Sequence, residues 1–171
     1  TARAFYRQDL ICRIIPEYLW YEKGITWGLI TSNVPSFRVL PEEATFDVGG
    51  SSVFLKSYEN YNFFLGLLNS KVFLTIVKIF NPTLNFQVKD IRSMPIKLEK
   101  TDAVNAIVEE TLILSSSDWN AFEISWDFIR HPLICGERTV AEAFSKWEHK
   151  AAERFDTLKA NEEELNRIFI D

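Results

Sequence analysis

The feature that most constrains the fold is the run of residues 58–80, where apolar side chains are too dense for a helix that lies on the protein surface. This density predicts one long helix, or two shorter helices, with much of the surface buried. The dipeptide Asn81-Pro82 follows directly. Because proline lacks a backbone N–H and clashes with the preceding turn, it predicts the end of the helix.

The polar and aromatic segment after this proline predicts a short strand over residues 83–88. Alternate side chains of an extended chain point to opposite faces, so Asn85 and Gln87 are expected on one face. Asp90 is suited to cap a turn over residues 91–94. The opposite face of the strand is apolar and carries Leu84, Phe86 and Val88.

Residues 1–57 are interpreted as β-rich and irregular, because short runs of strand-forming residues are broken by Gly and Pro. From Thr101 onward the apolar period becomes helical. The predicted fold class is α+β, with a mixed β/α portion (residues 1–100) followed by a helical portion (residues 101–171). The expected strands are residues 25–30, 37–40, 45–48 and 52–55, and the expected helices are residues 101–114, 117–126 and 138–168 with a loop at 131–137.

The net charge of −5 is an average over two unlike halves. Residues 1–100 hold 12 Lys and Arg against 9 Asp and Glu, a net of +3, whereas residues 101–171 hold 7 against 15, a net of −8. The first half is therefore suited to face phosphates. The second half is repelled from phosphates and is better suited to meet protein or solvent.

The cysteines and the apolar runs place the chain in the cytoplasm. Cys12 and Cys135 match no metal-binding spacing, so free thiols in a reducing compartment are expected. No apolar run reaches the roughly 18 residues that span a bilayer, and the N-terminus shows no signal-peptide pattern. We expect no membrane partner. Because the chain opens mid-pattern and stops directly after a helix, it is expected to be a piece of a larger protein.

An ordered series of motifs runs through nearly the whole chain. They are GITW (24–27), SFR (36–38), FD (46–47), GSSVF (50–54), LLNSKV (67–72), NPTLNFQVKDIRSMPI (81–96), FEISWDFIRHPL (122–133) and LKANEEELNRIFID (158–171). Together they resemble the C-terminal part of the large adenine-specific DNA methyltransferases of phage-resistance (BREX/Pgl-type) systems and of their type IIG restriction relatives. The resemblance implies a target-recognition and spacer region of an S-adenosylmethionine-dependent enzyme.

The chemistry of methyl transfer is missing from these residues. An adenine-specific methyltransferase needs an Asn/Asp-Pro-Pro-Tyr/Phe motif and a glycine-containing loop for S-adenosylmethionine, and Asn81-Pro82-Thr83 is only a partial match. There is no Walker loop and no PD-(D/E)xK nuclease pattern. His131 and His149 are expected to be surface or capping residues rather than metal ligands. We therefore expect no catalysis, metal or cofactor in this fragment, and S-adenosylmethionine in a missing catalytic domain.

Recognition of double-stranded DNA needs side chains that reach base edges and cations that hold phosphates. Asn85 and Gln87 are suited to adenine contacts, or else are solvated residues of an edge strand. Trp27 is either a core anchor or a wedge between bases. The candidates for DNA contact are Lys23, Thr26, Trp27, Asn33, Ser36, Arg38, Lys56, Asn85, Gln87, Lys89 and Arg92.

The predicted function is a DNA sequence-recognition fragment of a site-specific adenine-N6 DNA methyltransferase. Its acidic half is a spacer, or a docking surface for the missing methyltransferase domain or for other defence-system proteins. The alternative is a protein–protein interaction module of a defence complex without DNA contact. A free-standing hydrolase is least favoured, because the sequence offers no nucleophile–base pair.

Overall fold

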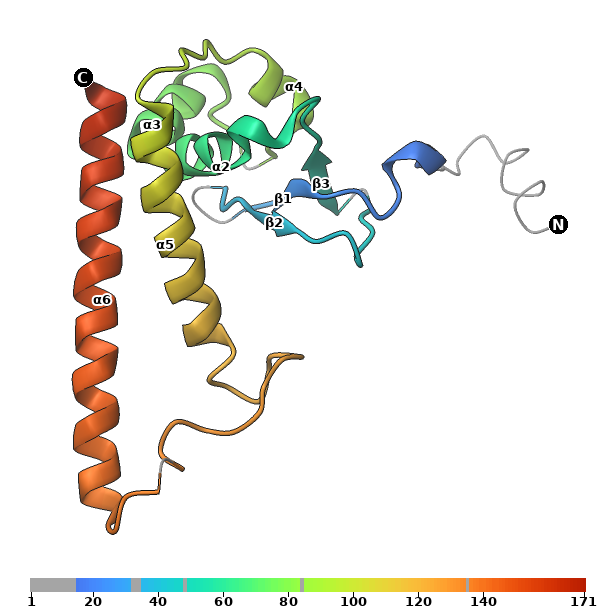
Figure 1. Ribbon diagram of the computed structural model, residues 1–171. Helices are drawn as coiled ribbons and strands as arrows, with labels where there is room; N and C mark the ends of the chain where they lie inside the picture. Colours follow the sequence, from blue (N-terminus) through green and yellow to red (C-terminus); the bar gives the residue numbers. More distant parts are fainter. Residues whose placement is uncertain (1–14, 32–34, 48, 84, 135) are drawn as a thin grey trace, which may run out of the picture. The chain divides into compact units, whose positions relative to one another are not determined.

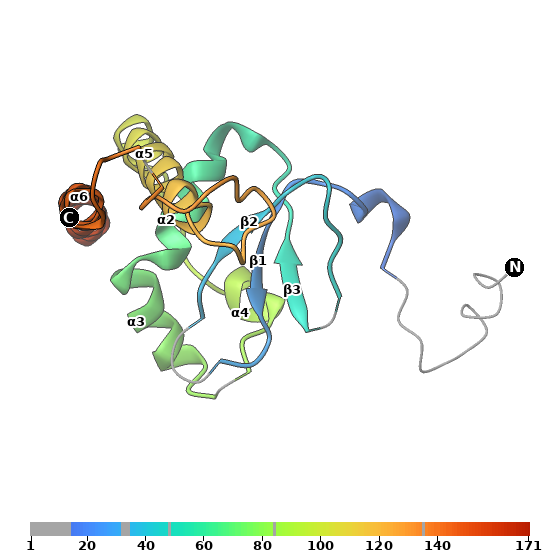
Figure 2. The same ribbon diagram turned by 90° about the horizontal axis from the view of Figure 1, so that it is seen from below.

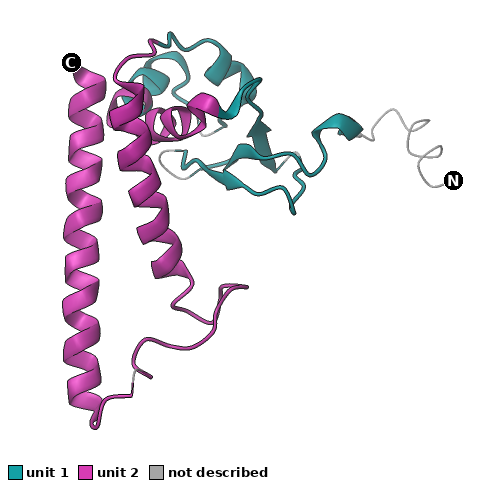
Figure 3. Ribbon diagram, in the orientation of Figure 1, with its two compact units in different colours: residues 1–58, 74–96 teal, residues 59–73, 97–171 magenta. Residues whose placement is uncertain are grey.

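The computed structural model describes residues 15–31, 35–47, 49–83, 85–134 and 136–171. The chain forms two compact units, each assembled from two stretches of sequence (Figure 3). Unit 1 comprises residues 1–58 and 74–96, and unit 2 comprises residues 59–73 and 97–171. An antiparallel sheet in unit 1 and long helices in unit 2 confirm the α+β class. The division of function near residue 100 stays a prediction. The boundaries of the compact units do not coincide with it, because residues 59–73 belong to unit 2.

Three strands of unit 1 form one antiparallel sheet in the order β2-β1-β3 (Figure 1, Figure 2). In the central strand, Ile25 lies opposite Val39 on one side and Val53 on the other. Ile25 and Trp27 are buried and alternate with the half-buried Thr26, as the period of two in a strand requires. The strands are β1 (Gly24–Gly28), β2 (Arg38–Leu40) and β3 (Gly50–Val53), preceded by a 3-10 turn η1 (Glu17–Leu19).

One expected strand is wrong. Residues 45–47 have no regular structure, and Val48 lies outside the described residues. The reason is a turn at Asp47, whose Oδ1 accepts the N–H of Gly49 at 2.8 Å and of Gly50 at 3.0 Å. Such side-chain-to-backbone bonds are typical of aspartate in turns. They turn the chain directly before β3 begins.

The apolar run forms two helices, which confirms one of the two alternatives. After a 3-10 turn η2 (Tyr58–Asn60) come α2 (Tyr61–Asn69) and α3 (Lys71–Phe80). Ser70 separates them, because its Oγ donates to Leu67 O at 2.7 Å and accepts from Phe73 N at 3.1 Å. Among the described residues no single helix is long and apolar enough to cross a membrane, and only α2 with its preceding turn and α3 reach that length together, as a bent pair.

The expected strand over residues 83–88 and the expected cap at Asp90 are both wrong. Leu84 lies outside the described residues. Among the others of this segment, only Asn85 makes a bridge, to Ile30, and the helix α4 (Val88–Arg92) begins at its end. Gln87 is the N-cap residue, and Asp90 lies three positions later, where its Oδ2 accepts the Gln87 N–H at 2.7 Å. Asp90 therefore caps the helix from inside its first turn.

Two long helices complete unit 2: α5 (Thr101–Trp119) and α6 (Val140–Ile170). The predicted start of α6 is confirmed within two residues, and Thr139 and Glu142 form a capping box there. A separate helix over residues 117–126 is wrong. Ser117 and Asp118, the residues suited to cap such a helix, lie in the last turn of α5, where Asp118 pairs with Arg154 of α6 at 3.0 Å. Helix α5 thus continues through Trp119, and residues 120–127 form turns and bends.

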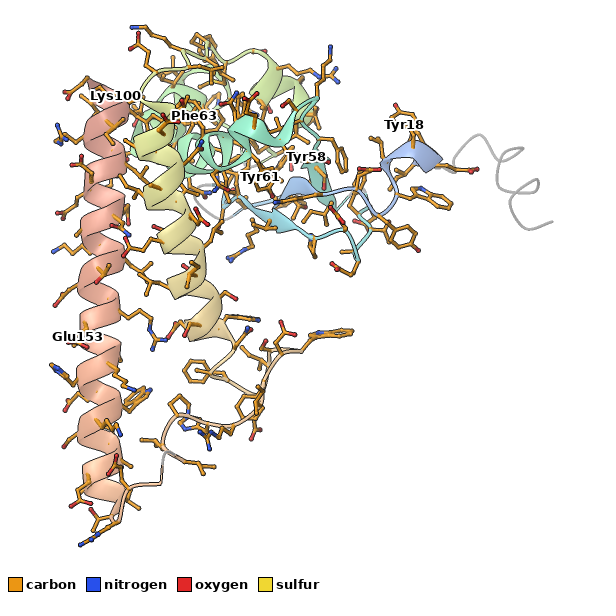
Figure 4. The ribbon with its side chains drawn as sticks, in the orientation of Figure 1. Tyr18, Tyr58, Tyr61, Phe63, Lys100 and Glu153 are labelled. Carbon is orange, nitrogen blue, oxygen red and sulfur yellow. The ribbon has the colours of Figure 1, made fainter. Side chains whose placement is uncertain are left out.

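The core of unit 2 is formed where α2, α5 and α6 pack together (Figure 4). Phe63 on α2 is 1% exposed and meets Phe169 of α6 edge-on, with ring centroids 5.6 Å apart. Asn166 of α6 is buried, and its Oδ1 accepts the backbone N–H of Lys71 at 2.7 Å. Gly66 allows α2 to approach α5 closely, because a Cβ there would lie 2.7 Å from Val108 Cγ2.

We expect Gly66→Ala to lower the free energy of unfolding by about 1–3 kcal/mol, the usual cost of overpacking a core. Val108 is buried and β-branched, so it has little freedom to turn away from the new methyl group. The better helix propensity of alanine, about 1 kcal/mol, offsets part of this loss. Urea unfolding followed by circular dichroism measures the change.

The matched control is the same substitution in a Val108→Ala background. There the new methyl group fills space that Val108 has vacated, so Gly66→Ala should cost nothing or should stabilise. An equal cost in both backgrounds contradicts a packing origin.

Candidate nucleic-acid interface

The loop of residues 81–87 is organised by the side chain of Asn81. Its Nδ2 donates to the backbone oxygen of Asn85 at 2.8 Å and to Asp90 Oδ2 at 2.8 Å. Its Oδ1 accepts from Thr83 N at 3.1 Å and from Thr83 Oγ1 at 2.6 Å. The helix stop predicted at Asn81-Pro82 is confirmed, and Asn81 also sets the path of the chain that presents Asn85.

The peptide groups of Phe86 tie this loop to the sheet. Its N–H donates to Leu29 O at 3.0 Å, and its carbonyl accepts the indole Nε1 of Trp27 at 2.9 Å. Next to it, Asn85 forms the antiparallel bridge with Ile30. These contacts join the end of β1 to a segment 59 residues later in the sequence.

Three aromatic rings pack beneath the loop and form the aromatic triad of unit 1: Trp27, Phe37 and Phe86. Their centroids are 5.5 Å (Trp27–Phe37), 5.8 Å (Trp27–Phe86) and 5.7 Å (Phe37–Phe86) apart, and all three rings are buried. Tilted and edge-on pairs at this separation contribute about 0.5–1.5 kcal/mol each beyond their buried area. The triad therefore gives the loop a rigid apolar base.

The first candidates along the chain have structural partners. Trp27 is 2% exposed, so it is a core anchor and not a wedge between bases; we remove it from the candidate interface. Thr26 is half-buried, and its Oγ1 donates to Ser51 O at 3.1 Å. Lys23 is half-buried, and its carbonyl accepts the Tyr58 hydroxyl at 3.0 Å.

The Tyr58 hydroxyl lies within hydrogen-bonding reach of both this carbonyl and the Glu22 carboxylate. Desolvation, followed by the nearby carboxylates of Glu22 and Glu42, raises the pKa of Tyr58 above its ordinary value. The phenol therefore stays protonated at neutral pH. The bond holds the backbone at Lys23, directly before β1.

Seven candidates are exposed, and Asn33 lies outside the described residues. Lys89 and Arg92 lie three positions apart on α4, so they share one face of that helix. Asn85 and Gln87 are exposed on either side of the buried Phe86, so the expected alternation is present although the segment is not a strand. The exposed candidates are Ser36, Arg38, Lys56, Asn85, Gln87, Lys89 and Arg92.

The cations of the two units differ in their partners. Within the described part of unit 1, five exposed cations form no ion pair: Arg38, Lys56, Lys78, Lys89 and Arg92. In unit 2, seven of the ten Lys and Arg residues pair with a carboxylate: Lys71, Lys97, Lys100, Lys146, Arg154, Lys159 and Arg167. Unit 2 neutralises most of its own positive charge, whereas unit 1 leaves these cations available.

Sequence reasoning missed Lys78 among these cations. Lys71, Thr75 and Lys78 are exposed, whereas Phe73 and Val77 of the same helix are buried. Their spacing of four and three residues marks the wet face of α3. This periodicity is the sequence signal from which the exposure of Lys78 could have been predicted. No group of His, Cys, Asp and Glu in the described ranges is arranged to hold a metal ion.

No family model matches the chain. It is 36% identical over 157 residues to the adenine-specific methyltransferase PglX of Lacticaseibacillus casei (strain Zhang). It is 28% identical over 152 residues to the adenine-specific methyltransferase BrxX of Escherichia coli O9:H4 (strain HS). Each match covers 88% of this chain. The chain is related to a segment of PglX and BrxX.

The predicted resemblance to adenine-specific methyltransferases is thereby confirmed. The chain spans only 13% of the length of PglX and 12% of the length of BrxX. The similarity therefore relates these residues to one part of such a protein, and the activity of the whole is a separate question.

We expect Trp27→Phe to lower the free energy of unfolding by about 1–3 kcal/mol, because it removes a buried hydrogen bond and part of a packed ring. The bond lost is the one from the indole to Phe86 O. Urea unfolding measures the loss, and amide hydrogen exchange at residues 85–87 should accelerate with it.

The control is Trp119→Phe, since this indole is 56% exposed. Surface substitutions of this kind change stability by less than about 0.5 kcal/mol. Equal effects of the two substitutions would show that the Trp27 contact has no special weight.

Proposed function

We propose that the chain is the DNA target-recognition and spacer fragment of a site-specific adenine-N6 DNA methyltransferase that acts in the cytoplasm. Residues 1–100 hold the recognition surface for double-stranded DNA, and residues 101–171 form the spacer. The similarity to two adenine-specific methyltransferases supports the parent activity. The partners proposed for the fragment are DNA and the remaining methyltransferase domain.

The observation that carries the DNA-binding role is the set of five exposed cations of unit 1 without ion pairs. A lysine or arginine that is already paired must give up its carboxylate before it binds a phosphate. An unpaired one releases a counterion from DNA at no such cost. Lys89 and Arg92 are the strongest pair for this role, because α4 presents both on one face.

Base reading is assigned to Asn85 and Gln87. An amide side chain can make a bidentate contact with adenine, worth about 1–3 kcal/mol of discrimination against other bases. The buried Phe86 between them, with its bonds to Leu29 and Trp27, holds the backbone of this short segment in place. Such preorganisation lowers the entropy lost on binding.

Methyl transfer is assigned to the parent protein outside these residues. Asn81 begins the nearest match to the base-gripping motif, but its amide already bonds Asn85 and Asp90. Its Oδ1, the atom that would accept from the amino group of a flipped adenine, already accepts from Thr83 N and Thr83 Oγ1. Asn81 therefore does not fit the flipped adenine, and we assign both this base and S-adenosylmethionine to the remaining part of the enzyme.

A second candidate function is a protein-interaction module without DNA contact. The observation in its favour is a series of exposed apolar side chains in unit 2, among them Trp126 and Ile129. Apolar docking depends weakly on salt, whereas phosphate contacts weaken steeply as salt rises.

The test is a salt series of duplex DNA binding by the chain and by its Lys89→Glu/Arg92→Glu variant. We expect the affinity of the unaltered chain to fall with salt. The variant should bind more weakly at low salt, with a slope of log K against log[salt] that is smaller by about two, because each lost phosphate contact removes about 0.9. Fluorescence anisotropy with a labelled duplex measures both values.

The matched control is Lys97→Glu/Lys159→Glu, which changes the net charge equally but alters cations that pair with Glu99 and Glu163. It should leave the slope unchanged. If both double variants lose affinity equally, the effect is one of net charge and the assigned DNA face is wrong. Absence of binding at low salt would favour the protein-interaction module.

A further inference from the structure

Residues 119–134 of unit 2 carry large apolar side chains that face solvent. Trp126 is 102% exposed and Ile129 is 90% exposed, and Trp119, Ile124 and Ile134 are exposed as well. Single exposed apolar residues are ordinary on protein surfaces, but five large ones within 16 residues of sequence suggest an interaction site. The group lies in the segment that connects α5 and α6 (Figure 1).

The backbone of this segment is held in a defined path. Ser125 is 8% exposed, and its Oγ donates to Asn120 Oδ1 at 2.7 Å. Ser125 N donates to Phe122 O at 3.0 Å, and Phe128 N donates to Ser125 O at 3.3 Å. The turn around Ser125 therefore presents the neighbouring Trp126 outward on a fixed base.

A hollow of about 320 Å³ lies in the same unit, between the end of α5, the beginning of α6 and Pro132. A cavity of about 150 Å³ is large enough for benzene, so this one has room for a large apolar side chain. Its apolar lining consists of Leu114, Ala121, Pro132 and Trp147.

Cations line this hollow and the one beside it. A second hollow of about 180 Å³ shares Pro132 and Lys150 with the first. Lys150 and Arg130 form no ion pair among the described residues, whereas Arg154 already pairs with Asp118. An occupant that adds a carboxylate beside its apolar side chain therefore gains a partner at Lys150 or Arg130.

Charge argues against nucleic acid as the occupant. Unit 2 holds ten Lys and Arg against 17 Asp and Glu, and the segment itself carries Glu123 and Asp127. This excess repels a polyanion from a distance. A protein segment with only a few carboxylates next to apolar side chains is matched by the local cations without that penalty.

We propose that residues 119–134 and the adjoining hollow are a docking surface for a segment of the same longer polypeptide that carries acidic and apolar side chains. We assign the docked segment to the same polypeptide because the related proteins are about eight times as long as the part that this chain spans. A tethered partner also has a high effective concentration, so a shallow hollow suffices to hold it. This assignment rests on the proposal that the chain is a fragment of a longer methyltransferase, and it does not depend on DNA binding.

The test is site-specific photo-crosslinking in the full-length protein. A Trp126→p-benzoylphenylalanine substitution should crosslink within the same molecule, to a peptide outside these 171 residues that contains Asp or Glu beside large apolar residues. Adding Arg130→Glu/Lys150→Glu should lower the yield at least fivefold, because the carboxylates then meet like charge. Mass spectrometry identifies the peptide and measures the yield.

The positional control is the same substitution at Ile170, which is 72% exposed at the other end of α6. It should give no crosslink to that peptide. A crosslink from Trp126 to a second copy or to DNA overturns the proposal, as does the absence of any product or a yield that charge reversal leaves unchanged. Lys89→Glu/Arg92→Glu should leave the crosslink intact, so a failure of DNA binding and a failure of docking are separate results.

Discussion

The hydrogen bond from the Trp27 indole to the carbonyl of Phe86 is the interaction on which unit 1 depends. Unit 1 is interrupted in the sequence by residues 59–73, which belong to unit 2. The bond rejoins the two stretches beneath the aromatic triad. The backbone N–H of Phe86 also bonds Leu29 O. The segment that carries Asn85 and Gln87 is therefore fixed in position relative to the end of β1. An exposed segment without regular structure thus rests on a buried contact between residues far apart in the sequence.

The elements set by local chemistry were predictable from the sequence. The end of α3 before Asn81-Pro82 and the start of α6 depend on neighbouring residues, and the sequence predicted both, the second to within two residues. The strand expected over residues 83–88 was wrong because the alternation of Phe86 with its polar neighbours indicates burial and does not by itself predict a ladder. The Phe86 peptide bonds Leu29 and the Trp27 indole, and among the described residues of this segment the pairing is limited to one bridge, between Asn85 and Ile30. Similarly, Asp118 is a residue type that often caps helices, but here it lies in the last turn of α5, where it pairs with Arg154.

For the candidate interface, residue type indicated the exposed amides and cations, because isolated polar residues on short elements are usually solvated. It did not decide whether Trp27 was exposed, since that depends on Phe37 and Phe86. The contrast between paired cations in unit 2 and unpaired cations in unit 1 also could not be predicted from the sequence. Ion pairs such as Arg154–Asp118 join residues on different helices, and net charge per half gives only their average.

Under the proposed function, the discontinuity of the units limits how the recognition surface can be transferred from a related protein. Helix α2 is encoded within the first hundred residues, yet its Gly66 and Phe63 pack on α5 and α6 of unit 2. A single crossover near residue 100 would import a recognition segment together with a foreign α2. The graft would then carry a helix whose surface was selected against another α5. The fit of α2 against α5 and α6 therefore limits which foreign segments unit 2 can accept.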